Sequence, residues 1–127
     1  MVDIRRSPRE GADHEACGAI SDVLARVGDK WSLLIVWTLG EGALRFNELR
    51  RRVAPISQKM LSSTLKVLER DGMVSRSVTP SVPPQVEYAL TDLGRELLEP
   101  VSGLAEWTSA NSPRIVAAQA AYDSRSA

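Results

Sequence analysis

Residues 57–72 read SQKMLSSTLKVLERDG, and this stretch decides the fold that the sequence predicts. Ser57 is a favourable N-cap and Asp71-Gly72 is a stop signal, so we expect a helix from Ser57 to Arg70. At about 100° per residue, apolar and polar side chains separate into two arcs. The apolar arc contains Met60, Leu61, Thr64, Leu65, Val67 and Leu68, and the polar arc contains Gln58, Lys59, Ser62, Ser63, Lys66, Glu69 and Arg70. One face of this helix should therefore pack on a core, while the other face is presented outward.

Three shorter helices are expected before this one. Apolar residues recur at helical spacing in each, and glycine or proline follows each stretch as a stop signal. The expected helices are Ala19 to Val27, a helix that Asp29 caps and Gly40 closes, and Asn47 to Val53 with Asn47 as its N-cap. Ala54-Pro55-Ile56 then breaks the chain before Ser57. Two helices joined by such a short turn are typical of a helix-turn-helix.

A β-hairpin is expected after the helix at 57–70. Residues 74–79 and 86–90 are β-prone, and the segment 80–85 between them contains three prolines, which cannot lie in a central strand and should form a stiff tip. Thr91 then caps a long helix, and a last helical piece is expected to start at Ser112-Pro113. The expected fold class is mainly α with a small β-hairpin, a winged helix-turn-helix with N- and C-terminal dimerisation helices.

Composition restricts the function classes. The chain has 127 residues, 43% hydrophobic and 25% charged, which is typical of one soluble globular domain. The longest apolar run, Leu33 to Trp37, is too short for a membrane span, and residues 1–15 lack the apolar stretch of a secretory signal. One cysteine and one histidine cannot form an internal disulfide, a Cys/His zinc site or a Ser-His-Asp triad. We therefore expect a cytoplasmic protein that has no membrane contact, no metal, no cofactor and no enzymatic activity.

Charge is concentrated in the middle of the chain, although the formal net charge is zero. Residues 45–76 hold eight basic and three acidic residues, a net charge of +5. Residues 1–44 hold five basic and seven acidic residues, and residues 77–127 hold three and six. Such a basic segment can meet DNA phosphates, whereas a merely solvated helix face is the alternative.

The polar face of the helix at 57–70 fits a DNA major groove, which is about 12 Å wide, with the hairpin beside it. Ser and Gln side chains suit base edges or phosphates, and Lys side chains suit phosphates. The expected DNA-contacting residues are Arg45, Arg50, Ser57, Gln58, Lys59, Ser62, Ser63, Lys66 and Gln85. A winged-helix protein–protein module without DNA binding is the alternative, and the zero net charge is its only support.

Several segments resemble one family of bacterial regulators. They are GDKWSLLI (28–35), RFNELRR (45–51), ISQKML (56–61) and VPPQVEYALT (82–91). From Cys17 to about Trp107, the chain is similar to the HxlR-type transcriptional regulators. The resemblance implies a homodimeric DNA-binding protein of MarR-like architecture, with a recognition helix at 57–70, a wing at 74–90 and dimer contacts from the first and last helices. The family often has Arg where this chain has Gln85, so we expect a weaker wing contact.

The resemblance also suggests how the chain is organised. We expect an arm at 1–16, a winged helix-turn-helix domain with a dimer helix at 17–107, and a helical extension at 108–127 that contributes to the dimer. The expected dimer contacts are Ile20, Leu24, Leu97, Leu104, Trp107 and Tyr122. The expected partners are double-stranded DNA with a pseudo-palindromic operator, a second copy of the chain, and an oxidant, quinone or small-molecule effector.

Cys17 is the expected redox-sensing residue. It precedes a predicted helix, where unpaired backbone N–H groups lower the pKa of a thiol, and in part of the family a cysteine at this place senses oxidants or electrophiles. A half-buried small residue at the dimer helix is the alternative. A ligand-responsive regulator is also an alternative, in which Trp31, Trp37 and Trp107 line a pocket, although a core role is favoured for Trp31. An enzyme with Cys17 as nucleophile lacks a credible base apart from His14.

Overall fold

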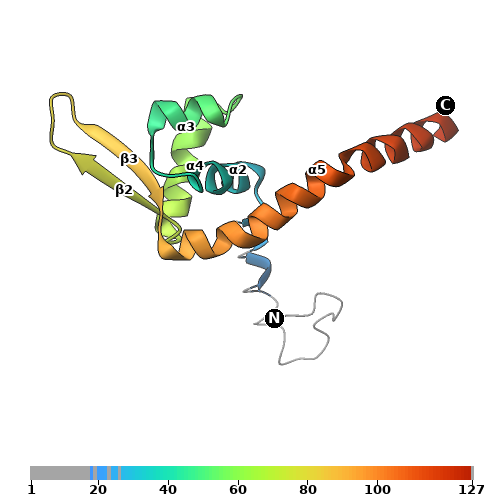
Figure 1. Ribbon diagram of the computed structural model, residues 1–127, viewed down its shortest axis with the longest axis horizontal. Helices are drawn as coiled ribbons and strands as arrows, with labels where there is room; N and C mark the ends of the chain where they lie inside the picture. The colour runs from blue at the N-terminus through green and yellow to red at the C-terminus, as the bar shows by residue number, and fades with distance from the viewer. Residues whose placement is uncertain (1–17, 19, 23, 26, 127) are drawn as a thin grey trace.

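The structure, a computed structural model, describes residues 18, 20–22, 24, 25 and 27–126, so Cys17 and His14 lie outside the described residues. The described residues from 18 to 27 are helical. The elements that follow are α2 (Lys30–Leu39), β1 (Leu44–Arg45), α3 (Phe46–Arg52), α4 (Gln58–Arg70), β2 (Val74–Thr79), β3 (Gln85–Leu90) and α5 (Asp92–Ser126). Figure 1 shows α2, α3 and α4 gathered into one body, with the β2–β3 hairpin extending to one side and α5 to the other. This arrangement is the predicted winged helix-turn-helix.

Helix α4 is anchored through one face. It starts after Ser57, whose Oγ accepts a hydrogen bond from the Met60 N–H at 3.1 Å and so caps the helix as predicted. Its buried residues are Leu61, Thr64, Leu65 and Leu68. Met60 and Val67, which the sequence places on the same apolar arc, remain 44% and 42% exposed. They lie at the edge of that arc, so the core covers only its middle.

The core lies where α2, α3 and α4 meet the sheet. Helix α2 starts after Asp29, whose carboxylate accepts a hydrogen bond from the Ser32 N–H at 3.0 Å, as the sequence predicts for an N-cap. The buried cluster contains Ile35, Val36, Leu39, Leu44, Leu49, Val53, Ile56, Leu61, Leu65, Leu68, Val74, Leu90 and Val101. Helix α2 therefore supports α4 from the side opposite its polar face.

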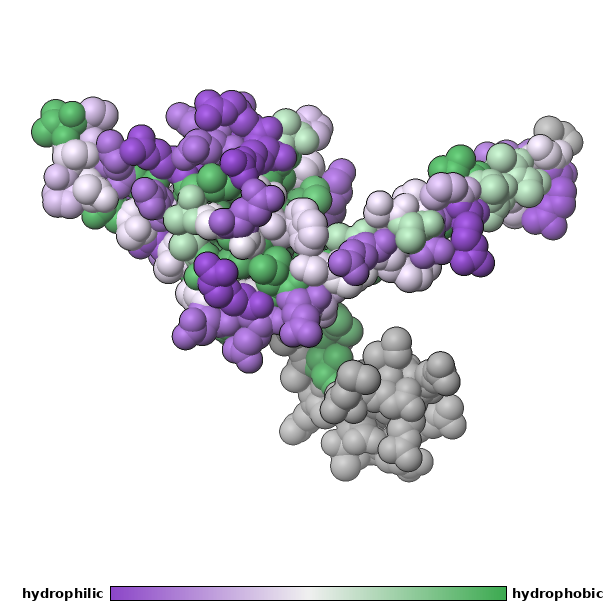
Figure 2. All heavy atoms as spheres, in the orientation of Figure 1, coloured by the Kyte–Doolittle hydropathy of each residue, from purple (hydrophilic) through white to green (hydrophobic). Residues whose placement is uncertain are grey.

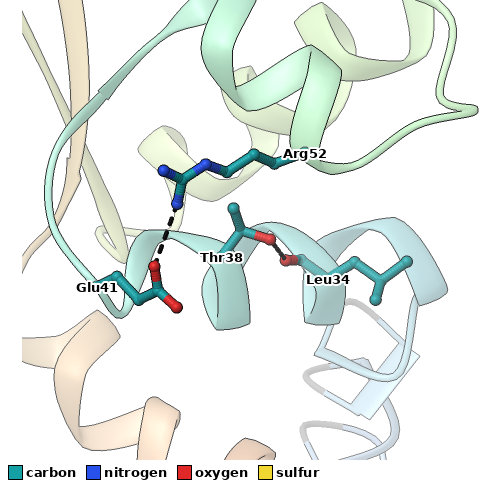
Figure 3. A network of polar contacts seen from close by, with 4 residues as sticks. All are labelled: Leu34, Thr38, Glu41 and Arg52. Carbon is teal, nitrogen blue, oxygen red and sulfur yellow. Dashed lines mark hydrogen bonds and ion pairs between the residues drawn. The ribbon is translucent and has the colours of Figure 1, made fainter.

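An ion pair joins the segment after α2 to the end of α3. Arg52 Nη1 lies 3.1 Å from Glu41 Oε2, and nearby on α2 the Thr38 hydroxyl donates to the Leu34 carbonyl oxygen at 2.7 Å (Figure 3). The two charged side chains are 51% and 81% exposed, so the pair contributes only about 0–1 kcal/mol to stability. The buried apolar side chains of the core, and not this ion pair, hold the helices together.

The sheet contains a strand that the sequence pattern did not predict. Its strand order is β1-β3-β2, and both pairings are antiparallel. Within the hairpin, the register runs from Val74 opposite Leu90 to Thr79 opposite Gln85, so β3 begins one residue before the predicted start at Val86. Strand β1 has only two residues, which is too short for an alternating pattern to be visible.

Helix α3 begins earlier than predicted. Its N-cap is Arg45, with φ −78° and ψ 159°, and not Asn47. The Arg45 backbone N–H donates to Glu48 Oε1 at 3.2 Å, so the Glu48 side chain reaches back over the start of the helix. Asn47 therefore lies in the first turn of α3, where its side chain faces outward and is exposed.

Helix α5 is continuous over 35 residues, a length of about 52 Å. It contains both Pro100 and Pro113, so the new helix start that we expected at Ser112-Pro113 is wrong. In the turns before Pro113, side chains donate to helix carbonyl oxygens, namely Thr108 to Leu104, Asn111 to Trp107, and Ser112 to Thr108. The Ala-rich segment that follows has high helix propensity, so the helix continues although Pro113 lacks a backbone N–H. The expected domain boundary between residues 107 and 108 falls inside this helix.

The start of α5 packs so closely that it accepts only glycine at position 94. A Cβ on buried Gly94 would overlap the Met73 carbonyl oxygen, whereas a Cβ on Gly103 would meet nothing within 4 Å. We expect Gly94→Ala to lower the free energy of unfolding by about 1–3 kcal/mol, and Gly103→Ala to raise it by about 0.5–1 kcal/mol. Urea unfolding at one fixed protein concentration measures both. Shifts of the same sign in the two variants would contradict this close packing.

Candidate nucleic-acid interface

Five of the predicted DNA-contacting residues lie together on the outer face of α4. An open hollow of about 510 Å³ is lined by Gln58, Lys59, Ser62, Ser63 and Lys66. Ser62 is half-buried, and the other four side chains are exposed. This surface lies opposite the buried leucines of the same helix, so it points away from the core. The structure thus brings these residues together, and their contact with DNA stays a prediction.

Two serines of the predicted set already form hydrogen bonds within the helix. Ser57 Oγ accepts from the Met60 N–H, and Ser63 Oγ donates to the Met60 carbonyl oxygen, each at 3.1 Å. The Ser57 hydroxyl therefore keeps its proton for donation to a phosphate, whereas Ser63 keeps lone pairs that can accept. Ser57 is suited to a phosphate oxygen, and Ser63 is suited to an amino group on a base edge.

A second hollow, of about 530 Å³, lies where α3 meets the turn before α4. Its lining residues are Asn47, Arg50, Arg51, Ala54, Pro55 and Ile56. Arg50 belongs to the predicted set, whereas Asn47 and Arg51 do not. The run Arg50-Arg51-Arg52 was the available signal for Arg51, but the sequence did not show which arginines face this hollow. The third, Arg52, pairs with Glu41 instead.

Arg45 and Gln85, two predicted residues that are 40 positions apart, are in direct contact: Arg45 Nη2 donates to Gln85 Oε1 at 2.5 Å. A third hollow of about 840 Å³ adjoins them between α3 and the hairpin, and Asn47 and Arg51 line both this hollow and the second. Figure 2 shows hydrophilic side chains gathered over the part of the body where α3 lies. The hollows therefore form one polar surface that runs from the turn before α4 to the wing.

Most of the predicted dimer contacts are exposed in the single chain. Ile20, Leu24, Leu104, Trp107 and Tyr122 are between 44% and 61% exposed. Leu97 differs, because it is half-buried and packs against the core. Ile115 and Val116, which were not predicted, are also exposed, at 42% and 61%. The single chain thus leaves a series of large apolar side chains in contact with solvent.

An apolar groove of about 600 Å³ lies between α2 and α5. Its lining residues are Gly28, Lys30, Leu33, Leu34, Trp37, Val101, Leu104, Ala105, Thr108 and Ser109. Within the described part of the chain, Trp37 is the one tryptophan that lines it. Trp31 packs against the core, as favoured, and Lys30 Nζ lies 4.6 Å from its ring centroid. The idea that three tryptophans share this groove is therefore wrong.

Comparison with known proteins now identifies the family. The family model for HxlR-like helix-turn-helix proteins matches residues 26–116, which include α2, the turn, α4 and the wing. The chain belongs to the HxlR-like helix-turn-helix family. The resemblance seen in the sequence is thus confirmed.

Individual relatives of this HxlR-like protein are also regulators. It is 45% identical over 96 residues to the HTH-type transcriptional regulator YtfH of Escherichia coli (strain K12), a match that covers 76% of each chain. The solved structure of the transcriptional regulator ytfH from Salmonella typhimurium is 41% identical, with a TM-score of 0.74, over 79% of this chain and 89% of that one. The redox regulator HypR in its reduced form is 38% identical, with a TM-score of 0.73, over 78% and 98%.

These matches establish the general function. The HxlR-like protein is a DNA-binding transcriptional regulator with a winged helix-turn-helix, and it is not an enzyme. Among the described helices, none combines the length and the hydrophobicity that crossing a membrane requires.

Lys59 and Lys66 are the two lysines of the α4 surface, and each should neutralise one DNA phosphate. We expect Lys59→Ala and Lys66→Ala each to make the slope of log Kobs against log salt concentration less negative by about 0.9 for each subunit that binds the DNA. Lys30→Ala is the matched control, because Lys30 lies on α2 beside the apolar groove and should leave the slope unchanged. Binding to duplex DNA measured by fluorescence anisotropy at several salt concentrations gives the slope. An unchanged slope in either α4 variant removes that lysine from the interface.

Proposed function

We propose that this HxlR-like regulator is a homodimeric repressor that reads a pseudo-palindromic operator with α4 of each subunit. The observation that carries this proposal is the outer face of α4, where Gln58, Lys59 and Lys66 are exposed on a helix whose other face is buried. An α-helix with its side chains is about 10–12 Å across, which matches a major groove about 12 Å wide. A dimer bound to an operator that overlaps a promoter would repress, because it would exclude the transcription machinery from the same DNA.

The surface beside α4 supports the same orientation on DNA. Arg50 and Arg51 line the hollow at the turn, and the first helix of a helix-turn-helix crosses the phosphate backbone while the second enters the groove. Backbone contacts of this kind set the position and register of α4, and base contacts from Gln58 and the serines supply the sequence preference. The two half-sites of the operator should lie about 34–36 Å apart.

The homodimer is supported by the apolar stripe of α5. At about 100° per residue, Leu97, Leu104, Ile115 and Tyr122 fall within about 20° of one another around the helix. The chain's own core half-buries Leu97, but Leu104, Ile115 and Tyr122 remain exposed. Figure 1 shows the distal half of α5 projecting away from the body. A second copy that covers this stripe removes it from water and holds the two α4 helices at a fixed spacing.

The stripe can be tested with two neighbouring residues on α5. We expect Ile115→Glu to convert the dimer to a monomer and to weaken operator binding, because the charge lies on the stripe. Val116→Glu introduces the same charge about 100° away around the helix and should leave the dimer intact. Light scattering after size exclusion measures the mass of each variant. A dimer that persists in Ile115→Glu, or dissociates equally in both variants, would contradict this interface.

Cys17 is the proposed switch, with an oxidant or quinone as effector. Its support is its place just before the first helix in the sequence and the likeness to HypR, which is described as a redox regulator. Because the chain has one cysteine, its thiol can join the Cys17 of a second copy, join a small thiol, or react directly with an electrophile. In a disulfide formed by diamide, two thiols lose two hydrogen atoms, which reduce diamide to the hydrazine.

The function and its switch are tested together on the DNA upstream of the protein's own gene. We expect reduced protein to bind this DNA above random DNA, and binding to change after diamide treatment in the wild type but not in Cys17→Ser. Anisotropy titrations of both proteins, with and without diamide, measure this. No preference over random DNA would contradict the repressor and favour a protein–protein module.

A ligand in the apolar groove is the second candidate switch. The groove volume of about 600 Å³ lies within the usual range for small-molecule sites, and Trp37 forms part of its wall. The groove lies between α2, which supports α4, and α5, which carries the exposed stripe. A ligand that fits only one arrangement of these helices would change the spacing of the two α4 helices. DNA binding that is specific but indifferent to diamide would favour this switch over Cys17.

A further inference from the structure

Strands β1 and β3 place three polar side chains on one face of the sheet. In the antiparallel register, Arg45 is directly opposite Glu87. Gln85 lies two residues before Glu87 on the same strand, so it is the diagonal neighbour of Arg45 on that face. The Arg45 guanidinium can therefore reach either a neutral amide or a carboxylate.

The Arg45 guanidinium is hydrogen-bonded to the Gln85 amide. Arg45 Nη2 donates to Gln85 Oε1 at 2.5 Å, and within the described part of the chain no ion pair joins Arg45 to Glu87. The second nearby acid, Glu48, accepts a hydrogen bond from the Arg45 backbone N–H through Oε1 at 3.2 Å, and among the described residues it forms no ion pair with the Arg45 guanidinium. An ion pair with Glu87 would neutralise the arginine, whereas a hydrogen bond to an amide leaves its full positive charge. Gln85 thus keeps this cation available.

We propose that Gln85 is a positioning residue for DNA binding, which holds Arg45 away from Glu87 so that Arg45 contacts a phosphate of the DNA backbone beside the wing. The proposal rests on the DNA orientation proposed above. In this arrangement, Gln85 makes no DNA contact of its own. The positive charge beside the wing is then supplied by Arg45 from β1.

The hollow between α3 and the hairpin suits a phosphate only while Arg45 and Gln85 stay hydrogen-bonded to each other. Arg45 and Arg51 contribute two positive charges to the hollow, and Glu48 and Glu87 contribute two negative charges. With Arg45 turned toward Gln85, a positive group stands at the hairpin end of the hollow. If Arg45 were paired with Glu87, that end would hold a neutral pair, and the phosphate would lose its partner. The choice between the two neighbours therefore decides whether this part of the surface attracts DNA.

The test uses the wild type and four variants, Arg45→Ala, Gln85→Ala, Glu87→Gln and the double variant Gln85→Ala/Glu87→Gln. We expect Arg45→Ala to make the salt slope of DNA binding less negative by about 0.9 for each bound subunit, which is about 1.8 for the proposed dimer, because each subunit loses one phosphate contact. Gln85→Ala should give the same shift, although it removes no charge, because Arg45 then pairs with Glu87. Glu87→Gln should keep the wild-type slope, and the double variant should return to it, because no carboxylate competes for Arg45.

Other results would overturn the proposal in distinguishable ways. Suppose that Gln85→Ala and the double variant Gln85→Ala/Glu87→Gln weaken DNA binding equally and leave the salt slope unchanged. Gln85 then contacts DNA itself. If Arg45→Ala leaves the slope unchanged, Arg45 does not meet a phosphate. In both cases the slope shifts of Lys59→Ala and Lys66→Ala would still support DNA binding through α4, whereas a wild type that does not bind DNA defeats both proposals. Arg45 is exposed and the other two are half-buried, so circular dichroism and urea unfolding should show an unchanged fold in every variant.

Discussion

The burial of one face of α4 is the constraint on which the rest of the structure depends. Leu61, Leu65 and Leu68 are at most 2% exposed, and they pack in one cluster with residues of α2 and the sheet. Because that face is fixed, the opposite face can only point outward, and its polar side chains are presented in a defined order. The positions of α3 and the wing then matter because they add charged groups at set places on either side of α4.

The distribution of charge explains how a chain with zero formal net charge is a DNA-binding regulator. The basic residues of segment 45–76 lie on β1, on α3, on α4 and at the start of the wing, and acidic residues predominate elsewhere. Two acids, Glu48 and Glu87, lie inside the polar surface itself. The Arg45 guanidinium is hydrogen-bonded to the neutral Gln85 amide, and among the described residues it forms an ion pair with neither acid. Local pairing, more than total charge, therefore determines which parts of the surface attract phosphate.

The sequence predicted the elements with long, periodic patterns and missed those set by contacts between distant residues. Ser57 and Asp29 cap their helices as expected, and the polar face of α4 is where the pattern placed it. The two-residue strand β1 and the helix start at Arg45 were missed. Strand β1 is defined by its pairing with a distant strand, and the helix start is defined by the Glu48 side chain that bonds back to Arg45, so neither produces a periodic pattern in the sequence. The bond between Arg45 and Gln85 spans 40 residues, and it becomes visible only when the register of β1 and β3 is known. The continuity of α5 through Pro113 was not predicted, because proline favours the first turn of a helix and so indicates a new start.

Because α5 is continuous, it moves as one rigid rod, and a small tilt near the core becomes a large displacement at its far end. Its base is packed against the core near Val101, and its far end lies about 52 Å from its start. From Val101 to Ser126 the helix is about 38 Å long, so a tilt of about 10° at Val101 moves the far end by roughly 6–7 Å. In the proposed homodimer, two bodies joined through their α5 helices would move apart or together by a comparable distance, about a fifth of the 34–36 Å between half-sites. In that dimer, a small rearrangement where α5 leaves the core would move the two α4 helices out of step with the turns of DNA.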